Sequence, residues 1–290
     1  MSDPQHSVQQ LIKKLALPKE AQANFERYWW PLAKRLAQVD KPMVLGISGA
    51  QGSGKSTLAT ALQILLGQTF GLQVATLSLD DLYFPLSHRR WLAQHIHPLL
   101  RTRGVPGTHD ITLGLELIRR LRQGHDLTLP RFDKASDDRR LEGEWLQGPV
   151  DLVIFEGWCL GASAQNDAAL EQPVNALEAE QDADGRWRHH VNQCLAGPYQ
   201  RLFGQMDMLI QLKAPNWQAV TRWRKEQEQA LIAMQGKGMD EAELSRFLLH
   251  YQRITEHQLR HSPANAIIYR LDEQRQVTDM QQGGKPDYVI

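Results

Sequence analysis

Apolar positions along the chain follow two rhythms, and the change falls at Met43. Before it, residues 8–38 carry apolar side chains mostly three or four apart, which predicts helices, with Pro18 separating two segments. After it, short apolar runs alternate with amphipathic stretches. The runs predict strands at 43–48, 74–79, 150–155, 208–212 and 266–271, and the stretches predict helices at 56–66, 113–122, 217–234 and 241–260. This alternation is typical of an α/β fold whose helices cover both faces of a parallel sheet.

The pattern predicts one main domain with a helical attachment. Residues 1–41 form an N-terminal helical extension, and residues 42–290 form the α/β domain. Residues 162–184 are polar and weakly patterned, so we expect a partly mobile, variable surface insertion within about 162–200.

Composition narrows the classes of partner. Lys plus Arg and Asp plus Glu number 33 each, so the formal net charge is zero, which argues against non-specific binding to nucleic acid or an anionic membrane. Two cysteines suit a reducing compartment rather than a disulfide scaffold. Neither a signal peptide nor an apolar run of about 18 residues is visible. We therefore expect a cytoplasmic protein that acts on a small molecule.

A glycine-rich segment after the first predicted strand carries the strongest motif. Residues 49–56 match G-x-x-x-x-G-K-[ST] between an apolar strand and an amphipathic helix. Such a loop points backbone N–H groups at phosphate oxygens, its lysine reaches the β- and γ-phosphates, and its serine hydroxyl binds Mg²⁺. The predicted ATP-binding residues are Gly49, Ala50, Gln51, Gly52, Ser53, Gly54, Lys55, Ser56 and Thr57.

Nucleotide binding alone leaves several classes of protein open. An Asn-Lys-x-Asp element, which reads guanine in GTPases, is absent from the sequence. The strand at 152–155 ends in Glu156-Gly157 rather than Asp-Glu, which weakens the assignment to motors and transporters. A small-molecule kinase is favoured, and a nucleotide-binding regulator or ATPase without a small-molecule acceptor is the alternative.

Carboxylates follow two of the predicted strands. Asp80 and Asp81 end the strand at 74–79, and Glu156 ends the strand at 150–155, at the edge where parallel sheets bind ligands. Asp80 is the candidate catalytic base, with Asp81 the alternative, and Glu156 is a candidate Mg²⁺ ligand with Ser56. An aspartate at a strand end can also simply cap the next turn.

Basic residues cluster in two loops and one helix. The loop at 101–110 contributes Arg101, Arg103, His109 and Asp110, and the segment at 129–134 contributes Arg131 and Asp133, as candidates to grip a small polar anion. The first loop could instead only cap the helix that follows, through Asp110. The helix at 217–234 carries Arg222 and Arg224, which a lid at about 217–240 could bring to the transferring phosphoryl group. The alternative for this helix is a solvated basic face.

The ordered set of segments resembles the P-loop kinase family of uridine kinase, phosphoribulokinase and bacterial pantothenate kinase. Within it, the chain most resembles the plant-type D-glycerate 3-kinases and their fungal ATP-binding relatives. The matching segments are GISGAQGSGKSTL (46–58), SLDDLY (78–83), LLRTRGVPGTHD (99–110), LPRFDK (129–134), VIFEGWCLG (153–161) and RWRKEQE (222–228). Leu82 replaces an aromatic residue of the family's Asp-Asp-Phe-Tyr-like segment.

The resemblance implies a parallel sheet of about five strands with a lid, and ATP and Mg²⁺ as cofactors. It places Lys55 and Ser56 on ATP and Mg²⁺, Asp80 at the base position, and Arg222 or Arg224 at the lid position. Tyr83 joins the acceptor candidates. The favoured reaction is phosphorylation of D-glycerate at its 3-hydroxyl, and a uridine- or pantothenate-kinase-like enzyme is the alternative within the family.

Overall fold

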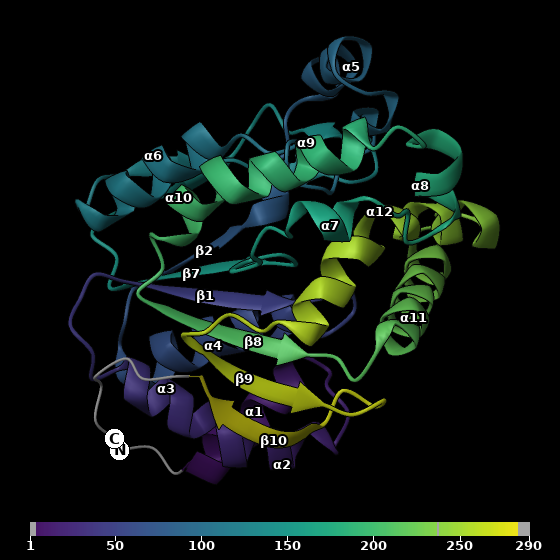
Figure 1. The fold of residues 1–290 in the computed structure, drawn as a ribbon. Coiled ribbons are helices and arrows are strands. Elements are labelled where there is room, and N and C mark those ends of the chain that lie inside the picture. Colours follow the sequence, from purple (N-terminus) through teal and green to yellow (C-terminus); the bar gives the residue numbers. More distant parts are fainter. Residues whose placement is uncertain (1–3, 237, 284–290) are drawn as a thin grey trace.

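The centre of the molecule is a six-stranded sheet with strand order β10-β9-β8-β1-β7-β2 (Figure 1). The computed structural model describes residues 4–236 and 238–283, so residue 237 of the predicted lid and the ends of both predicted regions, 1–3 and 284–290, lie outside the described residues. Five strands are parallel, and β10 runs antiparallel to β9. The strands are β1 (Met43–Gly49), β2 (Val74–Ser78), β7 (Leu152–Gly157), β8 (Met208–Lys213), β9 (Ala266–Leu271) and β10 (Val277–Gln282).

The predicted α/β fold is confirmed, with one strand more than expected. Every residue of β1 and β7 is buried, as continuous apolar runs require when helices cover both faces of a sheet. The added strand, β10, buries only Val277, and its other residues are exposed. An edge strand of this kind has no apolar run, so the hydrophobic pattern did not reveal it.

Two hydrophobic cores lie on opposite faces of the sheet, because successive side chains of a strand point to opposite sides. Val44 belongs to one core and its neighbour Leu45 to the other. Figure 1 shows α6, α9 and α10 over one face and α1, α3 and α4 over the other. These helices are α1 (Pro4–Lys14), α3 (Trp30–Leu36), α4 (Lys55–Phe70), α6 (Ile111–Arg122), α9 (Arg186–Cys194) and α10 (Gln200–Phe203).

The N-terminal helices pack closely on the α/β domain. Between α1 and α3 the chain forms α2 (Ala21–Asn24) and a π-helical segment, η1 (Phe25–Trp29). The ring centroid of Trp29 lies 4.6 Å from that of Tyr269 on β9. Val8 and Leu11 of α1 are buried in the core that includes α4. The extension therefore covers one face of the sheet, and its Asn24 also contacts the turn between β9 and β10 through Gln276.

Long helices stand at the carboxyl ends of the strands, at the right of Figure 1. These are α11 (Trp217–Gln235), which is the predicted lid helix, and α12 (Glu241–Arg260). Asp240 and Glu243 form a reciprocal capping box at the start of α12. Within the described ranges, none of the helices combines the length and the hydropathy that a membrane-spanning helix requires.

The stretch at about 162–200 is more tightly packed than its polar sequence predicts. It forms α7 (Asp167–Leu170), α8 (Ala176–Gln181), α9 and the π-helical segment η4 (Leu195–Tyr199). Leu170 and Leu177 are buried, and the buried carboxylate of Glu178 lies 2.6 Å from the guanidinium of Arg253 on α12. These contacts anchor the stretch to α12, while most of residues 163–184 are exposed, as expected of a surface stretch.

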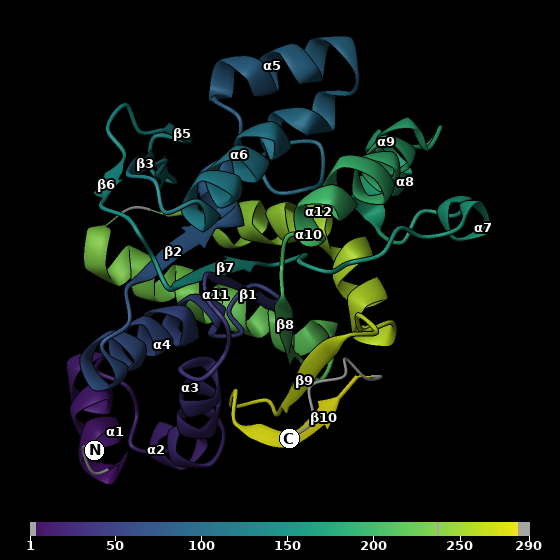
Figure 2. The same cartoon turned by 90° about the vertical axis from the view of Figure 1, so that its left-hand side faces the viewer.

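Several short elements follow β2 along the chain. After β2 come the 3₁₀ segment η2 (Leu79–Leu82), α5 (Leu86–His95) and η3 (Pro98–Arg101). Residues 127–146, which we call the arm, carry two small antiparallel sheets on the β2 side of the molecule (Figure 2). The strands of the arm are β3 (Leu127–Leu129), β4 (Phe132–Asp133), β5 (Asp138–Arg139) and β6 (Glu144–Leu146).

Candidate active site

A pocket of about 410 Å³ opens where β1, β2 and β7 end, between the glycine-rich loop and the helices α11 and α12. Its charged lining residues comprise one carboxylate, Asp80, and four cations. The cations are Lys55, Arg103, Lys134 and Arg224. An excess of positive charge in a concave site suits an anionic ligand.

The predicted ATP-binding residues form one continuous turn from β1 into α4. Gly52 and Gly54 have φ values of +75° and +89°, which side-chain-bearing residues rarely adopt. A Cβ atom at Gly52 would lie 2.7 Å from the Cβ of Trp223 on α11. The loop therefore requires glycine both for its conformation and for its approach to the lid helix. Gln51, Gly52, Lys55 and Ser56 line the pocket.

Glu156 lies beside the start of α4, as the sequence predicts. Its Oε1 accepts hydrogen bonds from the hydroxyl of Ser56 at 3.1 Å and from that of Ser78 at 2.8 Å. Its Oε2 lies 3.9 Å from the Lys55 ammonium and is buried, without a hydrogen-bond partner among the described residues. A buried carboxylate oxygen left free beside a serine hydroxyl fits the oxygen-ligand preference of Mg²⁺.

Asp80 lines the pocket, and both of its oxygens have partners. Oδ1 accepts a hydrogen bond from the hydroxyl of Tyr83 at 2.9 Å, and Oδ2 lies 2.7 Å from the ammonium of Lys134. Burial alone would raise the pKa of Asp80, but the positive charges of Lys134 and Lys55 hold that pKa well below its ordinary value. Asp80 is therefore ionised and can accept a hydrogen bond from a hydroxyl group.

Asp81 faces away from the pocket and holds the arm. Its Oδ2 lies 2.9 Å from Nη1 of Arg131, and its Oδ1 accepts a hydrogen bond from the backbone N–H of Phe132 at 3.0 Å. Burial raises the pKa of Asp81, and the hydrogen bond from Phe132 and the charge of Arg131 oppose this rise. The two neighbouring carboxylates thus have different surroundings, and Asp80 alone lines the pocket.

The loop at 101–110 contributes one cation to the pocket. Arg103 lines the pocket and pairs with Asp137 of the arm, whereas the side chain of Arg101 is exposed and lies outside the lining. Gly104 has a φ of +138°, and a Cβ there would meet the ring of Tyr251, whose hydroxyl donates to the carbonyl of Arg103 at 3.2 Å. This contact with α12 fixes the backbone that carries Arg103.

Asp110 caps the next helix, which is the alternative that the sequence left open. Its Oδ1 accepts a hydrogen bond from the backbone N–H of Leu113 at 3.0 Å, at the start of α6. Its Oδ2 lies 3.9 Å from the guanidinium of Arg139 on the arm. Asp110 lies outside the pocket lining and connects the loop to α6 and to the arm.

His109 is a buried and neutral part of the wall behind Tyr83. Its ring stacks on the ring of Tyr83 with centroids 4.4 Å apart, and its Nδ1 lies 2.5 Å from the hydroxyl of Tyr199. That hydroxyl also accepts a hydrogen bond from the backbone N–H of Gly107, and Nε2 of the ring is buried without a hydrogen-bond partner among the described residues. Burial lowers the pKa of His109 to about 3. His109 therefore carries no positive charge at neutral pH.

Arg131 and Asp133 both stabilise the arm and lie outside the pocket lining. Arg131 lies between Asp81 and Glu144, at 2.9 Å and 2.6 Å from their carboxylates. Asp133 accepts hydrogen bonds from the backbone N–H of Ala135 at 3.0 Å and from the hydroxyl of Ser136 at 2.8 Å. The two residues shape the turn that carries Lys134.

The two predicted lid arginines point in different directions from α11. Arg224 lines the pocket, 2.6 Å from the carboxylate of Glu228. Arg222 pairs instead with Glu273, in the turn between β9 and β10, and lies outside the pocket lining. The geometry therefore brings Arg224, and not Arg222, to the phosphate side of the site.

Lys134, Trp158 and Tyr251 line the pocket, although sequence reasoning did not select them. Lys134 ends the LPRFDK segment, where a lone lysine in a loop resembles a solvated one. Trp158 follows Glu156 by two residues and donates its Nε1–H to the carbonyl of Gly104 at 3.0 Å. Its place in the VIFEGWCLG segment was the available signal.

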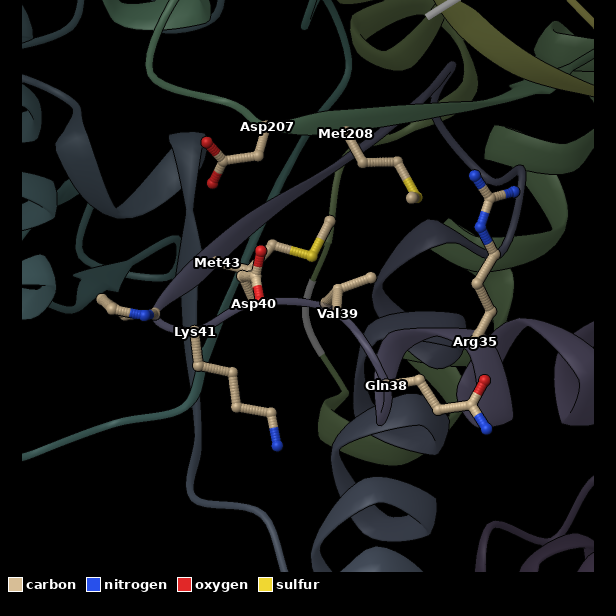
Figure 3. A pocket seen from close by; sticks show the side chains of 9 residues that line it. Arg35, Gln38, Val39, Asp40, Lys41, Met43, Asp207 and Met208 are labelled. Atoms are coloured by element: carbon tan, nitrogen blue, oxygen red, sulfur yellow. The ribbon is translucent and has the colours of Figure 1, made fainter. Parts of the chain in front are cut away.

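A second pocket, of about 380 Å³, lies at the other end of the strands, where β1 and β8 begin. Figure 3 shows Arg35 and Gln38 of the α3 side and Asp207 and Met208 of the β8 side around it. Among the described residues that line it, none is a predicted site residue. Because parallel sheets bind ligands at the carboxyl ends of their strands, we place the active site at the glycine-rich loop.

Comparison with known proteins agrees with this geometry, although no protein-family model matches the chain. The chain is 36% identical over 233 residues to the uncharacterized kinase mug58 of Schizosaccharomyces pombe, covering 76% of this chain and 82% of that protein. It is 29% identical over 222 residues to the chloroplastic D-glycerate 3-kinase of Arabidopsis thaliana. That match covers 72% of this chain and 46% of the plant protein, so the chain spans about half of its length.

A solved structure extends the likeness to the whole fold. The D-glycerate 3-kinase from Cryptococcus neoformans superposes with a TM-score of 0.73 at 27% identity, covering 91% of this chain and 99% of that one. This structural likeness, together with the 36% sequence identity to the S. pombe kinase, shows the family of the chain. The chain belongs to the P-loop kinase family that includes the S. pombe kinase and the D-glycerate 3-kinases, and is an ATP-dependent small-molecule kinase of this group.

Proposed function

We propose that the protein transfers the γ-phosphoryl group of ATP to the 3-hydroxyl of D-glycerate. One observation carries the proposal: the pocket beside the phosphate loop surrounds a single carboxylate, Asp80, with four cations. An acid of three carbons offers little apolar surface, so its binding depends on charge-assisted contacts to its carboxylate. The plant and Cryptococcus relatives, which are D-glycerate 3-kinases, support the same acceptor.

The phosphate side of the site would hold ATP with its charges neutralised. The backbone N–H groups of residues 49–56 and the start of α4 face the phosphates, and Lys55 reaches the β- and γ-phosphates. Ser56 and Glu156 would hold Mg²⁺, which supplies further charge neutralisation to the phosphates. Arg224 lies on the lid side of the same pocket and would stabilise charge on the transferring group.

The acceptor side would present the hydroxyl to the γ-phosphate. Ionised Asp80 accepts the hydrogen bond of the 3-hydroxyl, orients it for attack and takes its proton as the bond to phosphorus forms. Tyr83 keeps the Asp80 carboxylate in place through its hydrogen bond. Arg103 and Lys134 are the cations on this side that can reach the carboxylate of glycerate.

An ADP-release screen tests the proposal. Purified protein with ATP and Mg²⁺ receives D-glycerate, L-glycerate, uridine, pantothenate or ribulose 5-phosphate, and a reaction without acceptor measures ATP hydrolysis alone. We expect the highest turnover with D-glycerate and little ADP without an acceptor. Turnover with uridine or pantothenate but not glycerate would replace the acceptor and keep the kinase assignment. ADP release that no acceptor changes would indicate an ATPase.

A further inference from the structure

Lys134 occupies the oxygen of Asp80 that a substrate hydroxyl would need. Its ammonium lies 2.7 Å from Oδ2 of Asp80, while the Tyr83 hydroxyl holds Oδ1. In the free protein, therefore, both oxygens of the proposed base already have partners. A hydroxyl group can take the position of the ammonium on Oδ2 only after Lys134 has moved.

The surroundings of Lys134 allow such a movement, because a fixed turn carries an exposed side chain. The backbone of the arm is held at Phe132 by Asp81, and the turn after it is closed by hydrogen bonds to Asp133. The side chain of Lys134 itself is 63% exposed, whereas that of Asp80 is 28% exposed. Because most of its side chain is exposed, the lysine can rotate without unpacking its neighbours.

We propose that Lys134 is a specificity-determining residue that leaves Asp80 to pair with the anionic group of the acceptor, and so frees Oδ2 for the acceptor's hydroxyl. This inference rests on the proposed function. When Lys134 exchanges the carboxylate of Asp80 for that of the acceptor, the lysine still has an ion-pair partner. A neutral acceptor offers no replacement, so Lys134 stays on Asp80 and the hydroxyl cannot approach.

The position of Lys134 favours the acceptor over ATP as its new partner. Lys55 comes from the phosphate loop, whereas Lys134 belongs to the arm and Arg103 contacts the arm at Phe132 and Asp137. Arg103 is already paired with Asp137. The charge of Lys134 also lowers the pKa of Asp80, so its departure makes Asp80 a better proton acceptor at the moment when the substrate arrives.

Steady-state kinetics with a charged and an uncharged acceptor test this proposal. D-Glycerate and glycerol share the primary hydroxyl, but glycerol lacks the carboxylate. For Lys134→Met we expect a KM for D-glycerate raised by about 10- to 100-fold, the range of one hydrogen bond to a charged group. We expect the KM for ATP to stay within about twofold and the kcat/KM for glycerol to rise, because the methionine no longer covers Asp80. Lys134→Arg should retain most of the preference for glycerate.

Arg140→Met is the matched control, because Arg140 is an exposed cation on the same arm and lies outside the pocket lining. It should leave the kinetics with both acceptors unchanged. Thermal unfolding of each variant shows whether the fold is intact. If Lys134→Met reduces kcat/KM for D-glycerate and for glycerol by the same factor, the lysine has only a structural role and the inference is overturned. A raised KM for ATP overturns it as well.

Calorimetric binding of D-glycerate, with a non-hydrolysable ATP analogue present, separates this inference from the proposed function. Wild-type affinity should exceed that of Lys134→Met by the same factor as the KM change. Equal affinities, or no binding to either protein, overturn the inference. If glycerate binds more weakly to the variant but the wild-type protein phosphorylates no acceptor, the inference about Lys134 stands and the proposed function fails.

Discussion

The two halves of the pocket are built in different ways. The phosphate half is built around residues 49–57, one continuous turn whose shape depends on glycines at positive φ, to which Glu156 and Arg224 are added. The acceptor half comes from separate segments that meet only in the folded chain, and its cations pair with carboxylates of other turns or elements, as Arg103 does with Asp137 and Lys134 with Asp80. The proposed phosphate site is thus encoded locally in the sequence, whereas the proposed acceptor site depends on long-range pairing.

Removal of the phosphate-loop lysine should have the largest effect. Lys55→Ala takes away an ammonium placed to act on the β/γ-phosphates, and we expect kcat to fall by at least ~10²-fold. The fold should remain intact, because Lys55 lies at the pocket rather than in a core. Lys34→Ala, an exposed lysine on α3, serves as the control and should be neutral. Near-normal turnover of Lys55→Ala would refute the catalytic role of the loop.

The lid helix offers a matched pair of arginines for the next test. Arg224→Ala should lower kcat by about 10- to 100-fold with a smaller change in the KM for ATP, because its charge acts mainly on the transferring phosphoryl group. Arg222→Ala should have a much smaller effect on turnover, since Arg222 pairs with Glu273 outside the pocket. Equal losses in the two variants would contradict the assignment of Arg224 to the site.

On the acceptor side, Asp81→Asn should affect stability more than chemistry. Asparagine can still accept the hydrogen bond from Phe132, but it loses the charge that pairs with Arg131. We expect the free energy of unfolding to fall by about 1–3 kcal/mol, with kcat within a few-fold of wild type. Chemical denaturation and steady-state kinetics measure the two quantities. An Asp40→Asn control, at an exposed position, should change neither.

The buried network behind Tyr83 should give a dependence of stability on pH. The folded-state pKa of His109 is about 3, below its ordinary value near 6.5, so the unfolded chain binds a proton that the folded one does not. Stability is therefore fully present above about pH 6.5 and is lost as the pH falls toward 3, by at most ~1.4 kcal/mol per pH unit. In His109→Phe this slope should be smaller by about one proton, as measured by denaturation between pH 7 and 4. Parallel profiles for the two proteins would contradict a buried neutral His109.

The contrast between the local phosphate half and the long-range acceptor half also explains what the sequence could predict. Continuous apolar runs predicted the five parallel strands, and the glycine-lysine-serine spacing predicted the turn that holds ATP, because both signals lie within a few residues of each other. The paired carboxylates could not be assigned from sequence, since Asp81 turns toward Arg131, which is fifty positions away along the chain.

For the lid helix, the spacing of the two arginines contained information that the sequence prediction did not use. Residues two apart on a helix do not share a face, so Arg222 and Arg224 could not both point at the phosphates. Which of them does so depends on how α11 packs against the phosphate loop, where Trp223 approaches Gly52. Lys134 gave no local signal, because its partner Asp80 lies on a different element and the segment between them contains α5, η3 and α6.

The central claim is that the two halves of the site meet at Asp80, and one variant tests it most directly. Asp80→Asn keeps the size and hydrogen-bonding capacity of the side chain but cannot take a proton, and it lies outside the phosphate loop. We expect ATP affinity, measured by calorimetry, to stay close to that of wild type, while phosphoryl transfer to D-glycerate in a single turnover slows by at least ~10²-fold. Asp81→Asn in the same assay should transfer at a rate close to wild type. Normal transfer by Asp80→Asn, or a slow step in Asp81→Asn instead, would contradict the claim.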